Sequence, residues 1–201
     1  MPNLRKQQAE ATKMKVYAAA SRLLDKQSPE SVTIRMICKE AGVSTGALYH
    51  YFPTKDSIIV LFYDQMDNLA KRISKQLEGK PQLNAYERFV SFFVGQAEHI
   101  ANDNLENTKN LLSVQLKNPE IRLFSRNRLL YRYALRFYKE AQAEEFFSSD
   151  IPAEDMCDLV QSAFRGQWLD WGFHEIEYDL TQRVKFNTET ILNRVLIKKI
   201  D

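Results

Sequence analysis

The sequence has few of the residues that cross-link small proteins or anchor them in membranes. Only two of its 201 residues are cysteines, Cys38 and Cys157, and both fall on apolar faces of expected helices. We interpret them as buried thiols of a reducing compartment rather than as a disulfide. No N-terminal apolar run resembles a signal peptide, and no run of about 18 apolar residues could span a bilayer. The sequence therefore predicts a soluble cytoplasmic protein without membrane contact.

Motifs of catalysis and cofactor binding are also missing. There is no Gly-rich phosphate loop, no HExxH, no CxxC pair and no serine in a GxSxG context. The three histidines, His50, His99 and His174, are far apart and share no metal-ligand spacing. The sequence therefore predicts a protein that is not an enzyme and that needs no metal or cofactor.

Glycine and proline are scarce as well, with six of each, and runs of β-branched residues are rare. This composition favours an all-α fold, and 44% apolar residues can bury a core in one or two small domains. Charge is unevenly distributed, because residues 1–55 contain nine Lys or Arg against four Asp or Glu, whereas the remainder is mildly acidic. A basic segment joined to a less basic body is typical of a DNA-binding head.

The stretch TIRMICKEAGVSTGALYHYFPTK, which begins at Thr33, predicts a helix-turn-helix. Thr33 can cap a first helix whose apolar residues recur at i, i+3, i+4 and i+7. Gly42 can adopt the positive φ at which helices commonly end. Ser44 can cap the second helix, and Pro53 suits the break after it. The outward face of this second helix carries small and polar-tipped residues, which suit the major groove of DNA.

The residues AGVSTGALYHYFPTKDSI closely resemble the signature of the tetracycline-repressor (TetR) family of bacterial transcription regulators. The similarity extends back through VYAAASRLLDKQSPESVTI and covers about the first quarter of the chain. It implies an all-α, nine-helix architecture, with a three-helix DNA-binding head at 1–53 and a ligand-binding and dimerisation body at 54–201. It also implies a one-component repressor, which binds a near-palindromic double-stranded DNA operator as a homodimer and is released by a small molecule.

The residues predicted to contact DNA lie in the helix-turn-helix and directly after it. They are Arg35, Ser44, Thr45, Gly46, Tyr49, His50, Thr54 and Lys55. By resemblance to the family pattern the last four contact phosphates, whereas Thr45 is placed for contact with base edges. Three alternatives stay open: Arg35 is a plain solvated side chain, Gly46 serves only close packing, and Thr54 serves only as a helix cap.

Helical periodicity predicts nine helices along the chain. Their approximate ranges are 7–26, 34–41, 45–52, 54–78, 84–101, 105–117, 120–147, 152–173 and 180–199. Residues 1–6 are expected to form a loose arm. The helix at 54–78 is long enough to belong to both head and body, which makes it the natural mechanical link between them. By resemblance, the last two helices pair with those of a second protomer in a four-helix bundle.

Polar and aromatic side chains that interrupt the apolar faces of the body helices are candidates for an effector pocket. They are Gln96, His99, Gln115, Tyr131, Tyr138, Gln161, Arg165 and Trp168. The aromatic content of these helices points to an apolar or aromatic small molecule. The alternative for each residue is ordinary packing in the core or the dimer interface.

Five arginines follow one side of the helix predicted at 120–147. They are Arg122, Arg126, Arg128, Arg132 and Arg136. We interpret this stripe as a solvated face, and the alternative is a contact with an acidic partner or with DNA. A second hypothesis for the whole chain is a helical-bundle interaction or ligand-carrier module that does not bind DNA, in which the stripe would carry the partner.

Overall fold

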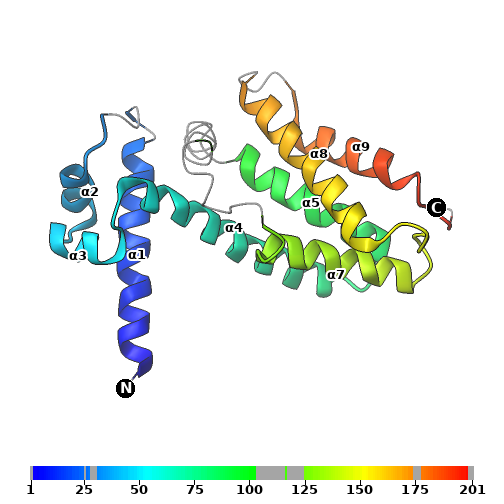
Figure 1. The fold of residues 1–201 in the computed structure, drawn as a ribbon, viewed down its shortest axis with the longest axis horizontal. Helices are drawn as coiled ribbons and strands as arrows, with labels where there is room; N and C mark the ends of the chain where they lie inside the picture. Colours follow the sequence, from blue (N-terminus) through cyan, green and yellow to red (C-terminus); the bar gives the residue numbers. More distant parts are fainter. Residues whose placement is uncertain are drawn as a thin grey trace. The chain divides into compact units, whose positions relative to one another are not determined.

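The computed structural model describes residues 2–24, 26–27, 31–102, 116, 125–173 and 178–198, which contain eight helices and no strand (Figure 1). Their bounds are α1 Pro2–Leu24, α2 Ile34–Ala41, α3 Thr45–Tyr51, α4 Lys55–Glu78, α5 Ala85–Ala101, α7 Leu129–Ala143, α8 Ala153–Phe173 and α9 Leu180–Leu192. The all-α prediction is therefore confirmed. The helix predicted at 105–117 lies outside the described residues, except for Leu116, which is helical.

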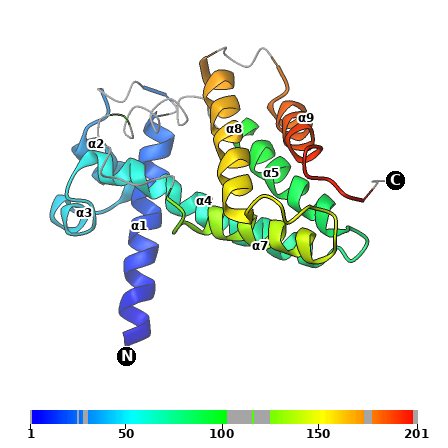
Figure 2. The same cartoon turned by 45° about the vertical axis from the view of Figure 1, so that its right-hand side comes forward.

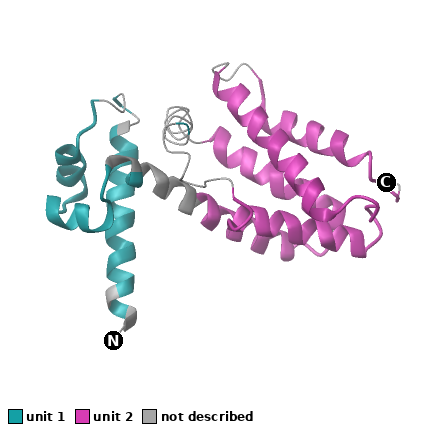
Figure 3. Cartoon of the chain, in the orientation of Figure 1, with its two compact units in different colours: residues 1–65, 106–123 teal, residues 66–105, 124–201 magenta. Residues whose placement is uncertain are grey.

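The chain divides into two compact units (Figure 3). Unit 1 comprises residues 1–65 and 106–123, and unit 2 comprises residues 66–105 and 124–201. Helix α4 contributes residues to both units. The boundary expected between residues 53 and 54 stays a prediction.

Local hydrogen bonds set the ends of α2 and α3 where the sequence predicted them. The Thr33 hydroxyl accepts a bond from the Met36 N–H at 3.3 Å, and the Ser44 hydroxyl accepts one from the Ala47 N–H at 3.1 Å. Gly42 has φ 65°, the left-handed conformation that favours glycine. The turn between α2 and α3 is therefore fixed by the side chains and the glycine of this stretch itself.

The core of unit 1 is built where α1, α2 and α3 meet (Figures 1 and 2). Its fully or nearly buried residues are Val16, Ala19, Ala20, Val32, Ile37, Cys38, Leu48, Phe52 and Ile58. Cys38 is a buried free thiol, as predicted, and so is Cys157 in α8. Burial of Leu48 turns the remaining faces of α3 away from this core, which positions the candidate site.

Four helix ends differ from the predictions by more than two residues. Helix α7 begins at Leu129 rather than at 120, and the described residues 125–128 before it are not helical. Helix α1 begins at Pro2, so the expected loose arm at 1–6 is wrong; proline suits the first turn of a helix because it has no N–H to leave unpaired. Helix α7 ends at Ala143 rather than at 147, because Glu145 takes φ 60° and the Phe146 N–H bonds back to the Ala141 carbonyl at 2.8 Å.

Helix α9 ends at Leu192 rather than near 199. The chain after it runs beside the segment that follows α7. The Ser148 N–H donates to the Val195 carbonyl at 2.8 Å, and the Ile197 N–H donates to the Phe146 carbonyl at 2.9 Å. These bonds to a segment about 50 residues away take the place of further helical turns, which periodicity alone did not predict.

Four helices of unit 2 close on one another, since α5 contacts α7 and α9, and α8 contacts the same two helices (Figure 2). Helix α5 begins with a capping box in which the Asn84 and Glu87 side chains each accept a bond from the other's backbone N–H. An aromatic cluster fills the centre, and most of its ring pairs meet edge to face. Its members include Phe89, Phe92, Phe93, Phe137, Tyr138, Phe147 and Phe164.

The arginine stripe of α7 is not simply a solvated face, so this interpretation was wrong. Arg126 pairs with Asp158 of α8, and Arg128 pairs with Asp67 of α4 at 3.2 Å. Arg136 lies 2.6 Å from Glu78 of α4 and donates to the Ser74 hydroxyl at 2.7 Å. Helical periodicity shows which residues share a face but not which acidic residues the fold places opposite. Arg132 is exposed, and Arg122 lies outside the described residues.

The hydrogen bond from Arg136 holds the pKa of the Glu78 carboxyl below its usual value, since it favours the charged form.

Asp67 caps the start of α7 in addition to its ion pair with Arg128. Its Oδ1 atom accepts bonds from the N–H groups of Leu129 and Leu130, at 3.0 and 3.4 Å. Arg128, the residue before α7, offers no side-chain cap, so a carboxylate from α4 caps α7 in its place.

Replacing Asp67 with Ala is expected to lower the free energy of unfolding by about 1–3 kcal/mol, because two backbone donors and a guanidinium lose their acceptor in a partly buried place. Urea unfolding followed by circular dichroism measures this. Glu10→Ala is the control: it removes an exposed ion pair with Lys13 and should cost less than about 0.5 kcal/mol. Equal costs for the two variants would show that Asp67 has no structural role beyond its surface charge.

Candidate DNA-binding face and effector site

Helix α3 presents one side to unit 1 and the other to solvent. Leu48 is 0% exposed within the core, whereas the adjacent Tyr49 is 49% exposed. Ser44, Thr45, Gly46 and His50 are also exposed, and the His50 ring meets the Tyr51 ring edge-on at 4.8 Å. Five of the predicted DNA-contact residues thus lie together on a single short element, where a duplex could reach them.

The other three predicted DNA-contact residues lie on either side of α3 in the sequence. Arg35 is exposed in the first turn of α2. The Thr54 hydroxyl accepts a bond from the Ser57 N–H at 3.1 Å, so Thr54 does cap α4, and its side chain is still exposed. Lys55 is the first residue of α4, and its side chain lies outside what the structure describes.

In the body, the strongest candidates for ligand contact are two buried polar side chains. Tyr138 is 0% exposed, and Gln161 is 8% exposed. Neither the Tyr138 hydroxyl nor the Gln161 Nε2 atom has a hydrogen-bond partner among the described residues. Burial raises the pKa of Tyr138, so its hydroxyl keeps its proton and can donate. Because an unpaired buried polar group costs about 1–3 kcal/mol, these atoms are suited to a bound polar group. Tyr138 is a member of the aromatic cluster, and Gln161 lies on α8 three residues before Phe164, another member.

Three further candidates are already engaged within the protein. Gln96 is buried and donates from Nε2 to the Phe92 carbonyl at 3.1 Å. The Tyr131 hydroxyl donates to the Glu154 carbonyl at 3.2 Å, and burial, together with the nearby Asp158 carboxylate, raises its pKa to about 12. Trp168 is buried in α8. These three residues therefore pack as core side chains.

The last three candidates for ligand contact are not buried core residues of the described structure. His99 lines a groove between α4 and α5. Arg165 is half-buried and donates to the Ser162 hydroxyl at 2.9 Å. Gln115 lies outside the described residues. Among the described residues, no group of three or more His, Cys, Asp or Glu could hold a metal ion, and no helix is long and apolar enough to cross a membrane.

Residues 16–60, which contain α2, α3 and the buried part of α1, match the sequence model of a family described as bacterial regulatory proteins, tetR family. The chain carries a TetR-family N-terminal segment. This match covers the whole helix-turn-helix and ends just inside α4. The exposed side of α3 lies within the matched segment.

Two relatives in sequence are named HTH-type transcriptional regulators. HbdR of Aromatoleum sp. (strain CIB) is 37% identical over 71 residues, which cover 35% of this chain and 31% of HbdR. The matched part therefore spans only about a third of that regulator. UidR of Escherichia coli (strain K12) is 23% identical over 151 residues, which cover 72% of this chain and 73% of UidR.

The solved structure of Thermus thermophilus FadR, a TetR-family repressor in complex with lauroyl-CoA, has a TM-score of 0.71 to this chain at 20% identity. The similarity covers 94% of this chain and 97% of FadR. It shows that this chain and FadR share a fold over nearly their full lengths.

Sequence reasoning missed the surface residues of the last two helices. Leu159 of α8 is 51% exposed, and Phe186 of α9 is 64% exposed. Beside Leu159 lie Ser162 and Gly166, which are exposed and small. The signal was present in the sequence, because Asp155, Leu159, Ser162 and Gly166 recur at helical spacing.

The two glycines of the TetR helix-turn-helix make a matched pair for substitution. At Gly46 an added Cβ would have no heavy atom within 4 Å, so packing inside the described protein does not require glycine there. At Gly42 the space is also open, but φ is positive. Gly42→Ala is expected to cost about 1 kcal/mol of unfolding free energy through backbone strain, whereas Gly46→Ala should not destabilise the helix.

If Gly46 lets α3 approach DNA closely, Gly46→Ala should nevertheless weaken operator binding by about tenfold. Thermal unfolding and fluorescence anisotropy with labelled DNA measure the two effects separately. Full operator affinity in Gly46→Ala would remove this residue from the DNA-contact set.

Proposed function

We propose that the chain is a one-component transcription regulator that represses its target as a homodimer and releases DNA when a small molecule binds its body. The observation that carries this proposal is the division of α3 into a buried side at Leu48 and an exposed side at Thr45, Tyr49 and His50. Such a division suits a helix that must be held firmly while it reads a groove. The basic charge of residues 1–55 favours the same partner.

The DNA contacts are proposed to follow the geometry of α3 and its neighbours. Thr45, in the first turn of α3, is proposed to contact base edges, and Tyr49, His50 and Lys55 are proposed to contact phosphates. Ser44 uses its hydroxyl oxygen to cap α3 but keeps its proton free to donate to a phosphate. Arg35 is proposed as a further phosphate or base contact.

The homodimer is proposed to form through α8 and α9. Their exposed residues Leu159 and Phe186 are large and apolar, and Ser162 and Gly166 would let a second helix approach closely. Pairing with the same helices of a second copy would bury these side chains in a four-helix bundle. Two heads related by the dyad would then read half-sites about 34–36 Å apart, which predicts a near-palindromic operator.

The effector is proposed to be a largely apolar molecule with at least one hydrogen-bonding group. The buried, unpaired atoms of Tyr138 and Gln161 would meet that group, and the surrounding aromatic rings would contact the rest. FadR, which shares the fold, binds lauroyl-CoA. Binding would release DNA only if the effector favours the conformation that cannot hold the operator.

We propose that the chain acts by binding alone, without catalysis, and that it acts in the cytoplasm, where bacterial operators are found. The second hypothesis, a helical-bundle module without DNA binding, is tested by the same experiment as the first. Its proposed partner surface, the arginine stripe, is largely engaged in ion pairs within the chain.

A mobility-shift titration with the promoter of the protein's own gene tests the regulator. The full chain should bind this DNA with a Kd at least 10³-fold lower than that for an unrelated duplex. The logarithm of the binding constant should fall linearly with the logarithm of salt concentration, because phosphate contacts release counterions. Equal, weak binding to both duplexes would favour the second hypothesis.

A further inference from the structure

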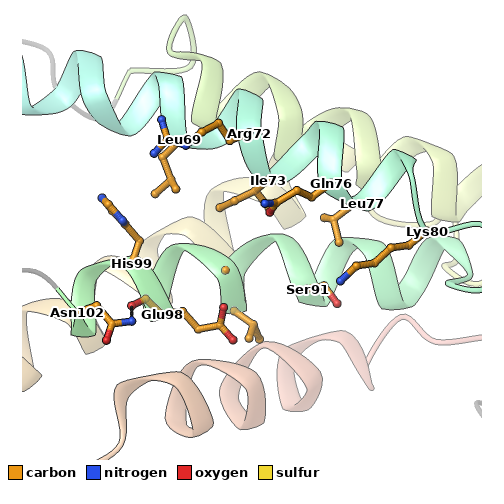
Figure 4. A pocket seen from close by; sticks show the side chains of 12 residues that line it. Leu69, Arg72, Ile73, Gln76, Leu77, Lys80, Ser91, Glu98, His99 and Asn102 are labelled. Carbon is orange, nitrogen blue, oxygen red and sulfur yellow. Dashed lines mark hydrogen bonds between the residues drawn. The ribbon is translucent and has the colours of Figure 1, made fainter.

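A groove of about 430 Å³ runs between α4 and α5 in unit 2, on residues that the candidate sites above do not use apart from His99 (Figure 4). Its apolar lining includes Ile73 and Leu77 of α4 and Val94 of α5. Gly95 brings the two helices together, since a Cβ there would lie 3.2 Å from Cδ1 of Ile73. A volume of this size suits a small organic molecule.

The two ends of the groove differ in charge. Lys80 extends from the end of α4 toward Ser91 of α5, and both line one end (Figure 4). Arg72 lies toward the other end, where Glu98 and His99 of α5 also line the groove. Arg72 lies within α4, whereas Lys80 follows its last residue, Glu78. The Lys80 end is therefore purely cationic, and the far end carries both signs of charge.

The charges of the groove differ from those on the α7 side of α4. On that side Asp67 is held in an ion pair with Arg128, directly before α7, and Glu78 in one with Arg136 of α7. Within the described part of the chain, by contrast, neither Arg72 nor Lys80 forms an ion pair. A lysine that faces a hydroxyl across an apolar floor, with no carboxylate bound to it, is suited to an anion brought by a ligand.

We propose that this groove binds an elongated organic carboxylate with an apolar body. Lys80 and the Ser91 hydroxyl hold the carboxylate group, and Ile73, Leu77 and Val94 contact the hydrocarbon. The groove is separate from the proposed effector site at Tyr138 and Gln161, which lies among the buried residues of α7 and α8. Because α4 carries the groove and also supplies residues to unit 1, occupancy is expected to influence DNA binding; only this last step rests on the proposed function.

Isothermal titration calorimetry with decanoate on the full chain tests the proposal. Lys80→Gln should weaken decanoate binding about tenfold, the loss of one charge-assisted hydrogen bond. Lys75→Gln is the matched control, because Lys75, on α4, is likewise an exposed lysine but does not line the groove. It should change the Kd less than twofold. Decanol, which has the same chain length but no charge, should not discriminate between the two variants.

Two further variants test where on the protein decanoate binds. Val94→Trp should abolish decanoate binding by filling the groove, with an unchanged melting temperature as evidence of folding. Tyr138→Phe should leave the decanoate affinity unchanged. Equal affinities of Lys80→Gln and Lys75→Gln, or loss of binding in Tyr138→Phe alone, would overturn the proposal.

A second copy of the chain could occupy the groove instead. That outcome would appear as monomers of Val94→Trp in sedimentation and no heat from decanoate, and it would also overturn the proposal. None of these measurements uses DNA, so a failure of the regulator hypothesis leaves them interpretable. A decanoate-dependent change in operator binding is measured separately by anisotropy.

Discussion

Replacing Leu48 with Ala is expected to lower the stability of unit 1 by about 2–5 kcal/mol, whereas Tyr49→Ala, one residue further along α3, should leave stability nearly unchanged and abolish tight DNA binding. Leu48 is fully buried, so its loss removes hydrophobic burial and leaves a cavity at the centre of the three-helix core. Tyr49 is about half exposed, so its loss changes little within the protein. The two effects should separate cleanly because the residues are adjacent but one side chain is buried and the other is exposed.

Hydrogen exchange resolved by segment and anisotropy with operator DNA measure the two quantities. In Leu48→Ala the amides of α1 to α3 should lose protection while those of α5, α7 and α8 keep it, since the latter have a core of their own. Tyr49→Phe is the control for Tyr49→Ala, because it retains the ring and removes only the hydroxyl. Strong destabilisation by Tyr49→Ala, with operator affinity unchanged, would show that this side of α3 serves folding rather than DNA.

The double variant Leu159→Glu, Phe186→Glu is expected to be a folded monomer whose operator affinity is at least 100-fold lower. Both side chains are mostly exposed, so glutamate is tolerated in the protomer, but in a paired bundle four carboxylates would lose water without partners. A monomer also loses the gain that comes from binding two half-sites as one unit, which commonly amounts to 10²–10⁴ in affinity.

Sedimentation velocity gives the oligomeric state and anisotropy gives the affinity. Ile197→Glu is the control, because Ile197 is 63% exposed but follows α9 rather than lying on its surface. It should remain dimeric. A double variant that still sediments as a dimer would place the interface elsewhere on the protein.

The parts of the fold that local chemistry determines could be predicted from the sequence. The bounds of α2 and α3 follow from Thr33, Gly42 and Ser44, each of which acts on the helix beside it. The ends of α7 could not be predicted this way. Its start is capped by Asp67, which is 62 residues away, and the segment after it bonds to residues beyond α9. Periodicity cannot reveal partners at such separations.

The same distinction applies to the sites. The proposed recognition face depends on seven consecutive residues of α3, so the sequence was enough to predict which residues would share that short helix. The groove depends on how closely α4 and α5 approach at Gly95, and its charge depends on which arginines and lysines other helices have neutralised. The unpaired atoms of Tyr138 and Gln161 are recognisable only once burial and hydrogen bonding are known.

Asp67 has a consequence for how the body can respond to any ligand. One carboxylate holds two amide groups at the start of α7 and one guanidinium, so a slide of α4 along α7 breaks all three contacts at once. A gradual shift of α4 along α7 has no intermediate position that keeps some of these three contacts of Asp67. The two helices should therefore occupy discrete registers. Adding effector should change the fraction of molecules in each register and should not move α4 gradually in every molecule.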